Sequence, residues 1–215
     1  MPVLSRWLPV LVAGLSLWGG ELLALDVNIT KEIPSITVKH GNKTVTVQRN
    51  QDPAATLDPE FAKISRKCPP FCAHPLEAAA GVKTVGEVEL IHFMNKELKD
   101  GTGILVDART PDWHAKGTIP GSINVPHTDL SPEGADAKTL EETMKRFGVS
   151  KQGAGWDFSK AKNLAMWCNG AWCGQSPTAI QNLLKMGYPA NKLFYYHGGM
   201  QSWKMFGLTV VPPAE

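Results

Sequence analysis

The residues with the clearest chemical potential lie in one short, glycine-containing segment that holds two cysteines. Cys168 directly follows an apolar run, and Cys173 comes five residues later. An ionised thiol is both a nucleophile and a redox centre. The segment therefore predicts thiol chemistry, with Cys168 as the catalytic nucleophile. The candidate binding loop around it is Asn169, Gly170, Ala171, Trp172, Cys173, Gly174, Gln175 and Ser176.

The surrounding backbone is expected to ionise the Cys168 thiol. Ser176 is a good N-cap and Pro177 a good first helical residue, so we expect a helix to begin there. Gly170 and Gly174 let the chain curl and direct several backbone N–H groups inward. The helix N-terminus adds about half a positive charge. These features predict a lowered thiol pKa and a cradle for a persulfide; the alternative is an inert buried thiol.

The remaining cysteines leave several possibilities open. Cys173 can act as a resolving thiol toward Cys168, or it can simply fill space. In an exported protein we expect a local Cys68–Cys72 disulfide across Pro-Pro-Phe, although cross-links to the loop are also conceivable. With His74 these two thiols form an incomplete ligand set, so no metal site is expected. We expect no cofactor.

The N-terminus has the pattern of a secretory signal peptide over residues 1–24. Arg6 precedes an apolar stretch from Trp7 to Gly19, which is shorter than a membrane span needs, and Ala24 suits a cleavage site. An uncleaved anchor is the alternative. We expect a periplasmic or secreted protein with no membrane attachment after cleavage.

The elements that must position the loop follow from the pattern of apolar residues. Residues 25–83 predict an N-terminal β extension and the cysteine-bearing connector, with strands near 27–29, 36–38 and 45–47 and a short helix over 59–66. From residue 84 the pattern predicts alternating helices and strands, beginning with a helix that Thr84 and Glu87 cap. The expected strands are 104–106, 123–125, 164–167 and 193–196, and the later helices are 140–147, 177–186 and 200–206. This order predicts an α/β fold with a mainly parallel sheet flanked by helices.

Composition agrees with a globular protein that has a hydrophobic core. Of 215 residues, 43% are hydrophobic and 20% charged, which excludes disordered, collagen-like and coiled-coil proteins. The net charge of +2 argues against a dedicated nucleic-acid binder. Four cysteines are too few for a disulfide scaffold.

Two further blocks resemble a known family. Residues 106–126 contain Asp107-Ala-Arg109 after an apolar strand and then Gly117-Thr-Ile-Pro-Gly-Ser-Ile-Asn-Val-Pro, similar to the rhodanese-domain signature. Residues 196–207 are similar to that family's closing helix, G-G-x-x-x-W-x-x-x-G. Cys168 falls where the family has its catalytic cysteine. The resemblance covers about residues 85–211, so we assign 84–211 to a rhodanese-like domain.

This resemblance implies a sulfurtransferase. In the family, the cysteine takes a sulfane sulfur from a donor such as thiosulfate and passes it to a thiophilic acceptor. The implied partners are a small sulfur-containing donor and a thiol acceptor, with a periplasmic sulfur-carrier or redox protein as a further candidate.

The loop departs from the family pattern in ways that bear on the donor. It is longer than usual, it has Gln175 where an arginine is common, and it carries Trp172 and Cys173. These differences favour a larger or less charged donor than thiosulfate. Thr118 replaces a usual histidine, which we interpret as a structural difference.

Other polar residues are expected to support the site. Asp107 and Arg109 suit an internal ion pair that fixes nearby loops. Trp113, His114 and His127 are candidates for the rim of the pocket, and His197 for a contact with the loop; a core or solvated role is the alternative for each. Two rival functions stay open: a thiol–disulfide oxidoreductase using Cys168 and Cys173, and a non-catalytic binding module.

Overall fold

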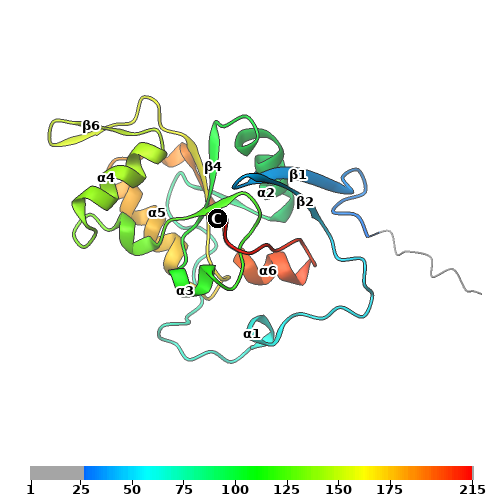
Figure 1. Ribbon diagram of the computed structural model, residues 1–215. Coiled ribbons are helices and arrows are strands. Elements are labelled where there is room, and N and C mark those ends of the chain that lie inside the picture. Colours follow the sequence, from blue (N-terminus) through cyan, green and yellow to red (C-terminus); the bar gives the residue numbers. More distant parts are fainter. Residues whose placement is uncertain (1–26, 215) are drawn as a thin grey trace, which may run out of the picture.

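The computed structural model describes residues 27–214. The expected signal peptide, residues 1–24, lies outside this range. Within it, no helix combines the length and apolar character needed to cross a bilayer. The described chain forms a β hairpin, a long connecting segment and an α/β unit (Figure 1).

A five-stranded parallel sheet forms the centre of the α/β unit. Its strand order is β3-β9-β8-β4-β5, and every neighbouring pair is parallel. The strands are β3 (Lys83–Val85), β4 (Gly103–Asp107), β5 (Ser122–Asn124), β8 (Asn163–Trp167) and β9 (Leu193–Tyr196). The predicted α/β class is therefore confirmed, and the four predicted strands of the sheet are all present.

Helices cover both faces of this sheet. Consecutive strand residues point to opposite sides, so Val106 joins one hydrophobic cluster and Leu105 the other. The first cluster includes residues of α4 (Ala137–Arg146) and α5 (Gln175–Lys185). The second includes residues of α2 (Glu87–Phe93) and α6 (Gly199–Met205), on the other side in Figure 1. Burial on both faces explains the continuous apolar strands in the sequence.

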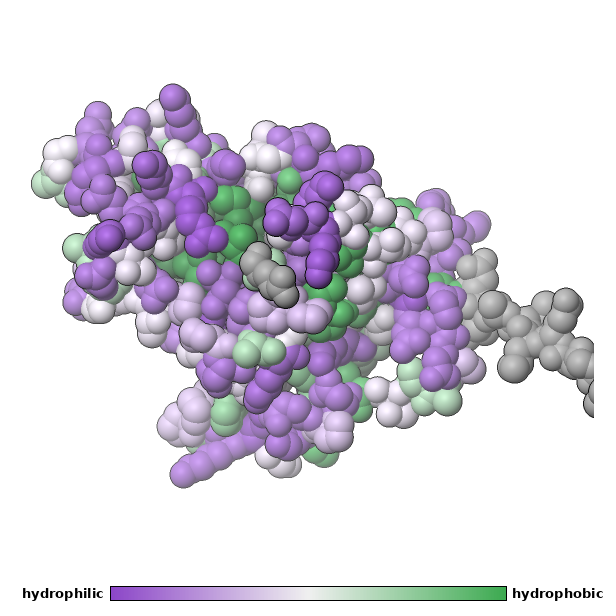
Figure 2. Space-filling model, viewed as in Figure 1, coloured by the Kyte–Doolittle hydropathy of each residue, from purple (hydrophilic) through white to green (hydrophobic). Residues whose placement is uncertain are grey.

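The N-terminal extension wraps around the α/β unit. Strands β1 (Ser35–His40) and β2 (Lys43–Gln48) form an antiparallel hairpin whose Ile36, Val38 and Val47 enter the second cluster. The chain then runs along the lower side in Figure 1 through α1 (Pro59–Ala62) and returns toward β3. The face of the molecule that is seen in Figure 2 is mostly hydrophilic, with hydrophobic residues gathered near its middle.

The remaining elements are short. They are the π-helical turn η1 (Met94–Leu98), α3 (Pro111–His114), η2 (His127–Leu130), η3 (Ala190–Lys192) and a two-stranded ribbon of β6 (Ser150–Gln152) and β7 (Gly155–Asp157). The ribbon was not expected from the sequence, because its strands are almost entirely polar and largely exposed.

Three local expectations are wrong. Val27 and Ile29 lie in irregular chain, not in a strand. Thr84 belongs to β3, and α2 begins at Glu87, where the Glu89 carboxylate accepts a hydrogen bond of 3.0 Å from the Gly86 N–H. The Pro59 helix ends at Ala62 and not at Arg66.

A fourth local expectation, that Ser176 caps the helix after the loop, is also wrong. Helix α5 begins at Gln175 with Gly174 as its N-cap, so Ser176 lies inside the first turn. The serine hydroxyl contacts the Cys168 sulfur instead of a helix N–H. Pro177 fits the first turn because N–H groups there have no intrahelical partner.

Candidate active site

Cys168 lies at the carboxyl end of β8, in the middle of the parallel sheet. Its side chain is 2% exposed. Ser176 Oγ donates a hydrogen bond to Cys168 Sγ at 3.0 Å, and as a thiol Cys168 Sγ donates to the Cys173 carbonyl oxygen, also at 3.0 Å. The sulfur thus contacts two residues of the loop that the sequence singled out.

The surroundings of this sulfur favour its ionised form. Burial raises the pKa of Cys168, but hydrogen bonds to the sulfur outweigh it and lower the pKa to about 7. The donors are the Cys173 thiol, the Ser176 hydroxyl and the backbone N–H groups of Ser176 and Gly170. These N–H groups come from the curled loop and the first turn of α5. A substantial fraction of Cys168 is therefore thiolate at neutral pH.

The first residues of the loop are hydrogen-bonded to the start of α6. The N–H groups of Met200 and Gln201 donate to the carbonyl oxygens of Cys168 and Asn169, each at 2.9 Å. A Cβ atom on Gly199, whose φ is +54°, would lie 2.3 Å from the Cys168 carbonyl oxygen. Only glycine fits at this position, which gives the closing Gly-Gly motif a direct role in shaping the loop.

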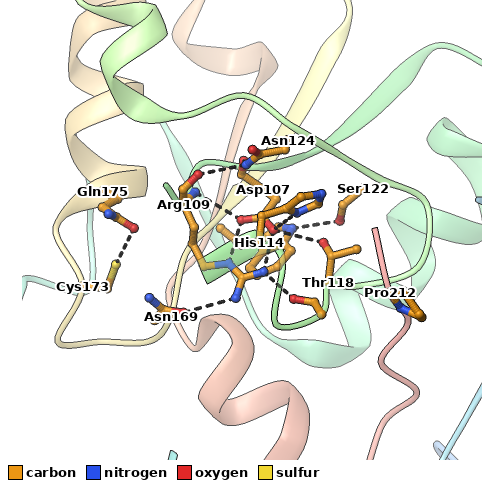
Figure 3. Close-up of polar contacts among 12 residues, drawn as sticks. Asp107, Arg109, His114, Thr118, Ser122, Asn124, Asn169, Cys173, Gln175 and Pro212 are labelled. Atoms are coloured by element: carbon orange, nitrogen blue, oxygen red, sulfur yellow. Dashed lines mark hydrogen bonds and ion pairs between the residues drawn. The ribbon is translucent and has the colours of Figure 1, made fainter. Parts of the chain in front are cut away.

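Asp107 and Arg109 form a buried network on the other side of the loop (Figure 3). Arg109 Nη2 pairs with Asp107 Oδ2 at 2.6 Å, and Nη1 donates to Asn169 Oδ1 at 3.3 Å. Thr118 Oγ1 donates to Asp107 Oδ2 at 3.0 Å, and His114 Nδ1 lies 2.8 Å from that oxygen. The ion pair thus links the end of β4 to the loop, as the sequence predicted.

A cleft of about 340 Å³ opens beside the loop. Aromatic and apolar side chains form much of its wall, together with polar loop residues; the lining is Pro70, Phe71, Trp113, His127, Asn169, Trp172, Cys173, Gly174, Gln175 and Thr178. Among these described residues there is no lysine or arginine. Cys168 lies beneath this lining, whereas Cys173 is part of it.

The connector builds one wall of the cleft. Cys68 and Cys72 are joined by a disulfide, which confirms that predicted pairing, and the segment between them contributes Pro70 and Phe71. The His74 N–H donates to the Ala171 carbonyl oxygen at 2.9 Å. The extension is therefore bonded directly to the candidate loop.

Trp172 is the centre of this contact between connector and loop. Its ring packs edge-on against Phe71 at 5.6 Å between centroids, and the Arg66 guanidinium lies 3.9 Å from its ring centroid. Its Nε1 donates to Gln201 Oε1 at 2.7 Å. Neither Arg66 nor Gln201 was predicted from the sequence to take part in the site. The aromatic residues in the connector and the loop were the available signal, but a sequence does not show that the two meet.

The histidines take different positions. His127 lines the cleft, and burial lowers its pKa. His114 is bound to Asp107 and does not line the cleft. His197 Nε2 lies 3.3 Å from the His74 carbonyl oxygen, so it contacts the connector and not the cysteine loop. Trp203, the tryptophan of the closing-helix motif, is fully buried in the core.

Replacing Ser176 by alanine is expected to raise the pKa of Cys168 by about 1 to 2 units, because a hydrogen bond to a charged group contributes about 1.5–3 kcal/mol. The pH profile of iodoacetamide alkylation at Cys168, followed by peptide mass, measures this change. The midpoint should move from near 7 to higher pH, since less thiolate then exists at neutral pH. Ser159→Ala, a hydroxyl far from the loop, is the control; an unmoved midpoint in Ser176→Ala would contradict the assigned contact.

Comparison with known proteins identifies the family. Residues 92–206 match the model of the rhodanese-like domain. The chain is 26% identical over 110 residues to the HTH-type transcriptional regulator Rv0324 of Mycobacterium tuberculosis. The aligned segment covers 51% of this chain and 38% of that protein. The chain thus spans well under half the length of this curated relative.

Two solved structures of similar fold are compared with this chain. A human single-domain sulfurtransferase, TSTD1, is 21% identical, with 57% of this chain and 96% of that chain covered and a TM-score of 0.39. A rhodanese from E. coli is 20% identical, with 51% and 98% covered and a TM-score of 0.34. The family match itself takes in more than half of the chain and contains Asp107, Cys168 and the Gly-Gly turn before α6. The chain belongs to the rhodanese-like domain family.

Proposed function

We propose that this protein is a sulfurtransferase that carries a sulfane sulfur as a persulfide on Cys168. The observation that carries the proposal is the environment of the Cys168 sulfur, which accepts hydrogen bonds from Ser176 and from loop N–H groups and has a pKa lowered to about 7. The same donors are placed to stabilise the negative charge of a persulfide. Family membership supports the same chemistry.

The proposed reaction consists of two sulfur transfers. The Cys168 thiolate attacks the outer sulfur of a donor persulfide, the donor S–S bond breaks, and the donor leaves as a thiolate. An acceptor thiolate then attacks the outer sulfur on Cys168, takes it, and restores the Cys168 thiolate. The two steps together cause no net oxidation. Because Cys168 lies beneath the cleft lining, the loop must shift to admit the donor sulfur.

The cleft favours an organic donor over thiosulfate. Its described lining carries no positively charged lysine or arginine, and Gln175 occupies the position where a cation would hold a dianion. Phe71, Trp113 and Trp172 offer apolar surface to the carbon part of a donor. An organic persulfide or polysulfide fits this lining better than a small dianion.

Intact mass spectrometry of the full chain tests the proposal. After incubation with glutathione persulfide, the protein should gain one sulfur (about 32 Da), and peptide mapping should place it on Cys168. Thiosulfate at the same concentration should give a smaller yield. Prior alkylation of Cys168 is the control and should prevent the gain. If no sulfane donor adds sulfur, the proposal fails and a non-catalytic binding module is favoured.

We also propose that the reaction takes place in the periplasm or outside the cell. The Cys68–Cys72 disulfide supports this location, because such bonds persist in oxidising compartments. There the acceptor would be a small thiol or a periplasmic sulfur-carrier or redox protein. Fractionation of cells that express the full chain, with the mass of the mature N-terminus, tests the location.

A further inference from the structure

Two buried cysteines lie next to one another within the candidate loop. The turn that carries Cys173 is closed by a 2.9 Å hydrogen bond from the Cys173 N–H to the Gly170 carbonyl oxygen. The Cys168 sulfur lies 3.0 Å from the Cys173 carbonyl oxygen. Neither thiol is in a disulfide, and both are buried. The Cys168 sulfur is therefore in contact with the residue that carries the second thiol.

The two thiols have opposite electrostatic properties. The hydrogen bond of the Cys173 thiol to the Cys168 sulfur raises the pKa of Cys173, and burial and the Cys168 charge act in the same direction. The pKa of Cys168 is instead lowered to about 7. Cys168 is thus the first nucleophile, and Cys173 keeps its proton beside it.

The position of Cys173 also differs from that of Cys168. Cys173 lines the cleft, where its Sγ lies 3.6 Å from Gln175 Oε1, and Cys168 lies underneath. A sulfur atom added to Cys168 must occupy the space next to Cys173. Any persulfide formed in this loop therefore has a second thiol as its neighbour.

We propose that Cys173 resolves a Cys168 persulfide, forming an internal Cys168–Cys173 disulfide and releasing the added sulfur as hydrogen sulfide. This inference rests on the proposed function, because it requires that the persulfide form. It adds an activity that sulfur transfer alone does not include: with a reducing thiol present, the protein would convert a persulfide donor to sulfide.

The atoms and electrons of this step balance. The Cys173 thiol passes its proton to the outer, negatively charged persulfide sulfur, and its own sulfur bonds to Cys168 Sγ. The bond between Cys168 Sγ and the added sulfur breaks, and the added sulfur leaves as hydrosulfide (HS⁻), which is in equilibrium with hydrogen sulfide in water. The thiol is oxidised by the sulfane sulfur, which is reduced, so no external oxidant is needed. Two equivalents of an external thiol then reduce the disulfide by exchange and restore both cysteines.

The experiment compares the wild-type chain with Cys173→Ser under non-reducing conditions. Both proteins are first brought to a state with the Cys68–Cys72 disulfide closed and the loop thiols reduced, and then receive glutathione persulfide. Samples are quenched by alkylation and weighed intact, and released sulfide is assayed in parallel. Serine retains a hydroxyl donor toward Cys168, and circular dichroism checks the fold of each protein.

The wild type should pass through the form with one extra sulfur (about 32 Da). As sulfide appears, it should reach a form that is two hydrogens (about 2 Da) lighter than the untreated protein and takes up no alkyl group on the loop cysteines. Cys173→Ser should hold the extra sulfur at least about tenfold longer and release little sulfide. A Cys68→Ser/Cys72→Ser double variant, whose connector holds no thiol, should still form the loop disulfide as sulfide appears, which excludes exchange with the connector. Its rate is not compared with that of the wild type, because the connector builds one wall of the cleft.

Three results would overturn the inference in different ways. If the wild type keeps its extra sulfur as long as Cys173→Ser does, Cys173 is not a resolving thiol, and the proposed sulfurtransferase function stands. If neither protein gains sulfur from any donor while Cys168 still alkylates normally, the proposed function fails and the inference fails with it. A loop disulfide that forms equally fast without donor would likewise overturn it.

Discussion

Replacing Cys168 by serine is expected to lower sulfur transfer from glutathione persulfide to cyanide by at least about a thousandfold, because an alcohol at neutral pH is not ionised and forms no persulfide. Serine is close to cysteine in size, so the contacts with Ser176 and the Cys173 carbonyl can persist. The assay is the initial rate of thiocyanate formation at pH 7.5 with full-length protein. The loss should appear in kcat as well as in kcat/KM, since the missing group takes part in the chemical step.

The fold of Cys168→Ser must be intact for this result to be informative. Its thermal midpoint and circular dichroism should match those of the wild type, because the substituted atom lies at a strand end and not among core methyl groups. Retention of full transfer by a folded Cys168→Ser protein would remove Cys168 from the mechanism. Cys173 would then be the thiol to test, because it lines the cleft.

The second large effect is expected at Asp107. Asp107→Ala should lower the free energy of unfolding by about 3–5 kcal/mol, because it leaves the buried Arg109 guanidinium without its counter-charge. His114 and Thr118 lose an acceptor at the same time. Denaturant unfolding, monitored by tryptophan fluorescence, measures the change. Asp112→Ala, which removes an exposed carboxylate from the neighbouring α3, should change the stability by less than about 0.5 kcal/mol.

A double variant separates the ion pair from simple loss of packing. Asp107→Ala/Arg109→Met removes both charges, so it should be less destabilised than the sum of the two single variants. Additive losses would show that the pairing contributes little. Either single variant should also loosen Asn169, which Arg109 holds at 3.3 Å, and slow sulfur transfer.

Acid should weaken the same network. Burial raises the pKa of Asp107, but hydrogen bonds from Arg109 and His114 and the Arg109 charge outweigh it and lower the pKa below 3.8. The folded state then binds protons less readily than the unfolded state does. The Asp107 contribution to stability is complete above the unfolded pKa of 3.8 and is lost as the pH falls through the lower folded pKa.

The sequence was sufficient to predict those elements whose local pattern of residues agrees with their place in the fold. The run Ile104–Val106 predicted a strand covered on both faces, and the structure places it between two other strands of the parallel sheet. Cys168 was recognised as the residue that follows the predicted strand 164–167, and it lies at the carboxyl end of β8. These assignments rest on periodicity and on strand ends, which depend little on distant contacts.

The failures occur where a side chain takes a distant partner. Ser176 has the chemistry of an N-cap, but its hydroxyl is directed to the Cys168 sulfur, and the helix begins one residue earlier than it. Likewise, the bond from His74 to Ala171 joins chain segments that no local rule relates. The route of the connector over the cleft therefore could not be deduced, although its disulfide could.

The wall formed by the connector has a consequence for protein engineering. Pro70 and Phe71 lie outside the family-matching segment, which starts at residue 92. Transplanting residues 168–176 into another member of the family would carry over the thiols but leave Trp172 without Phe71 and Arg66 around its ring. The wall of the cleft is thus shared between two stretches of chain, and a chimera reproduces it only when it receives both together.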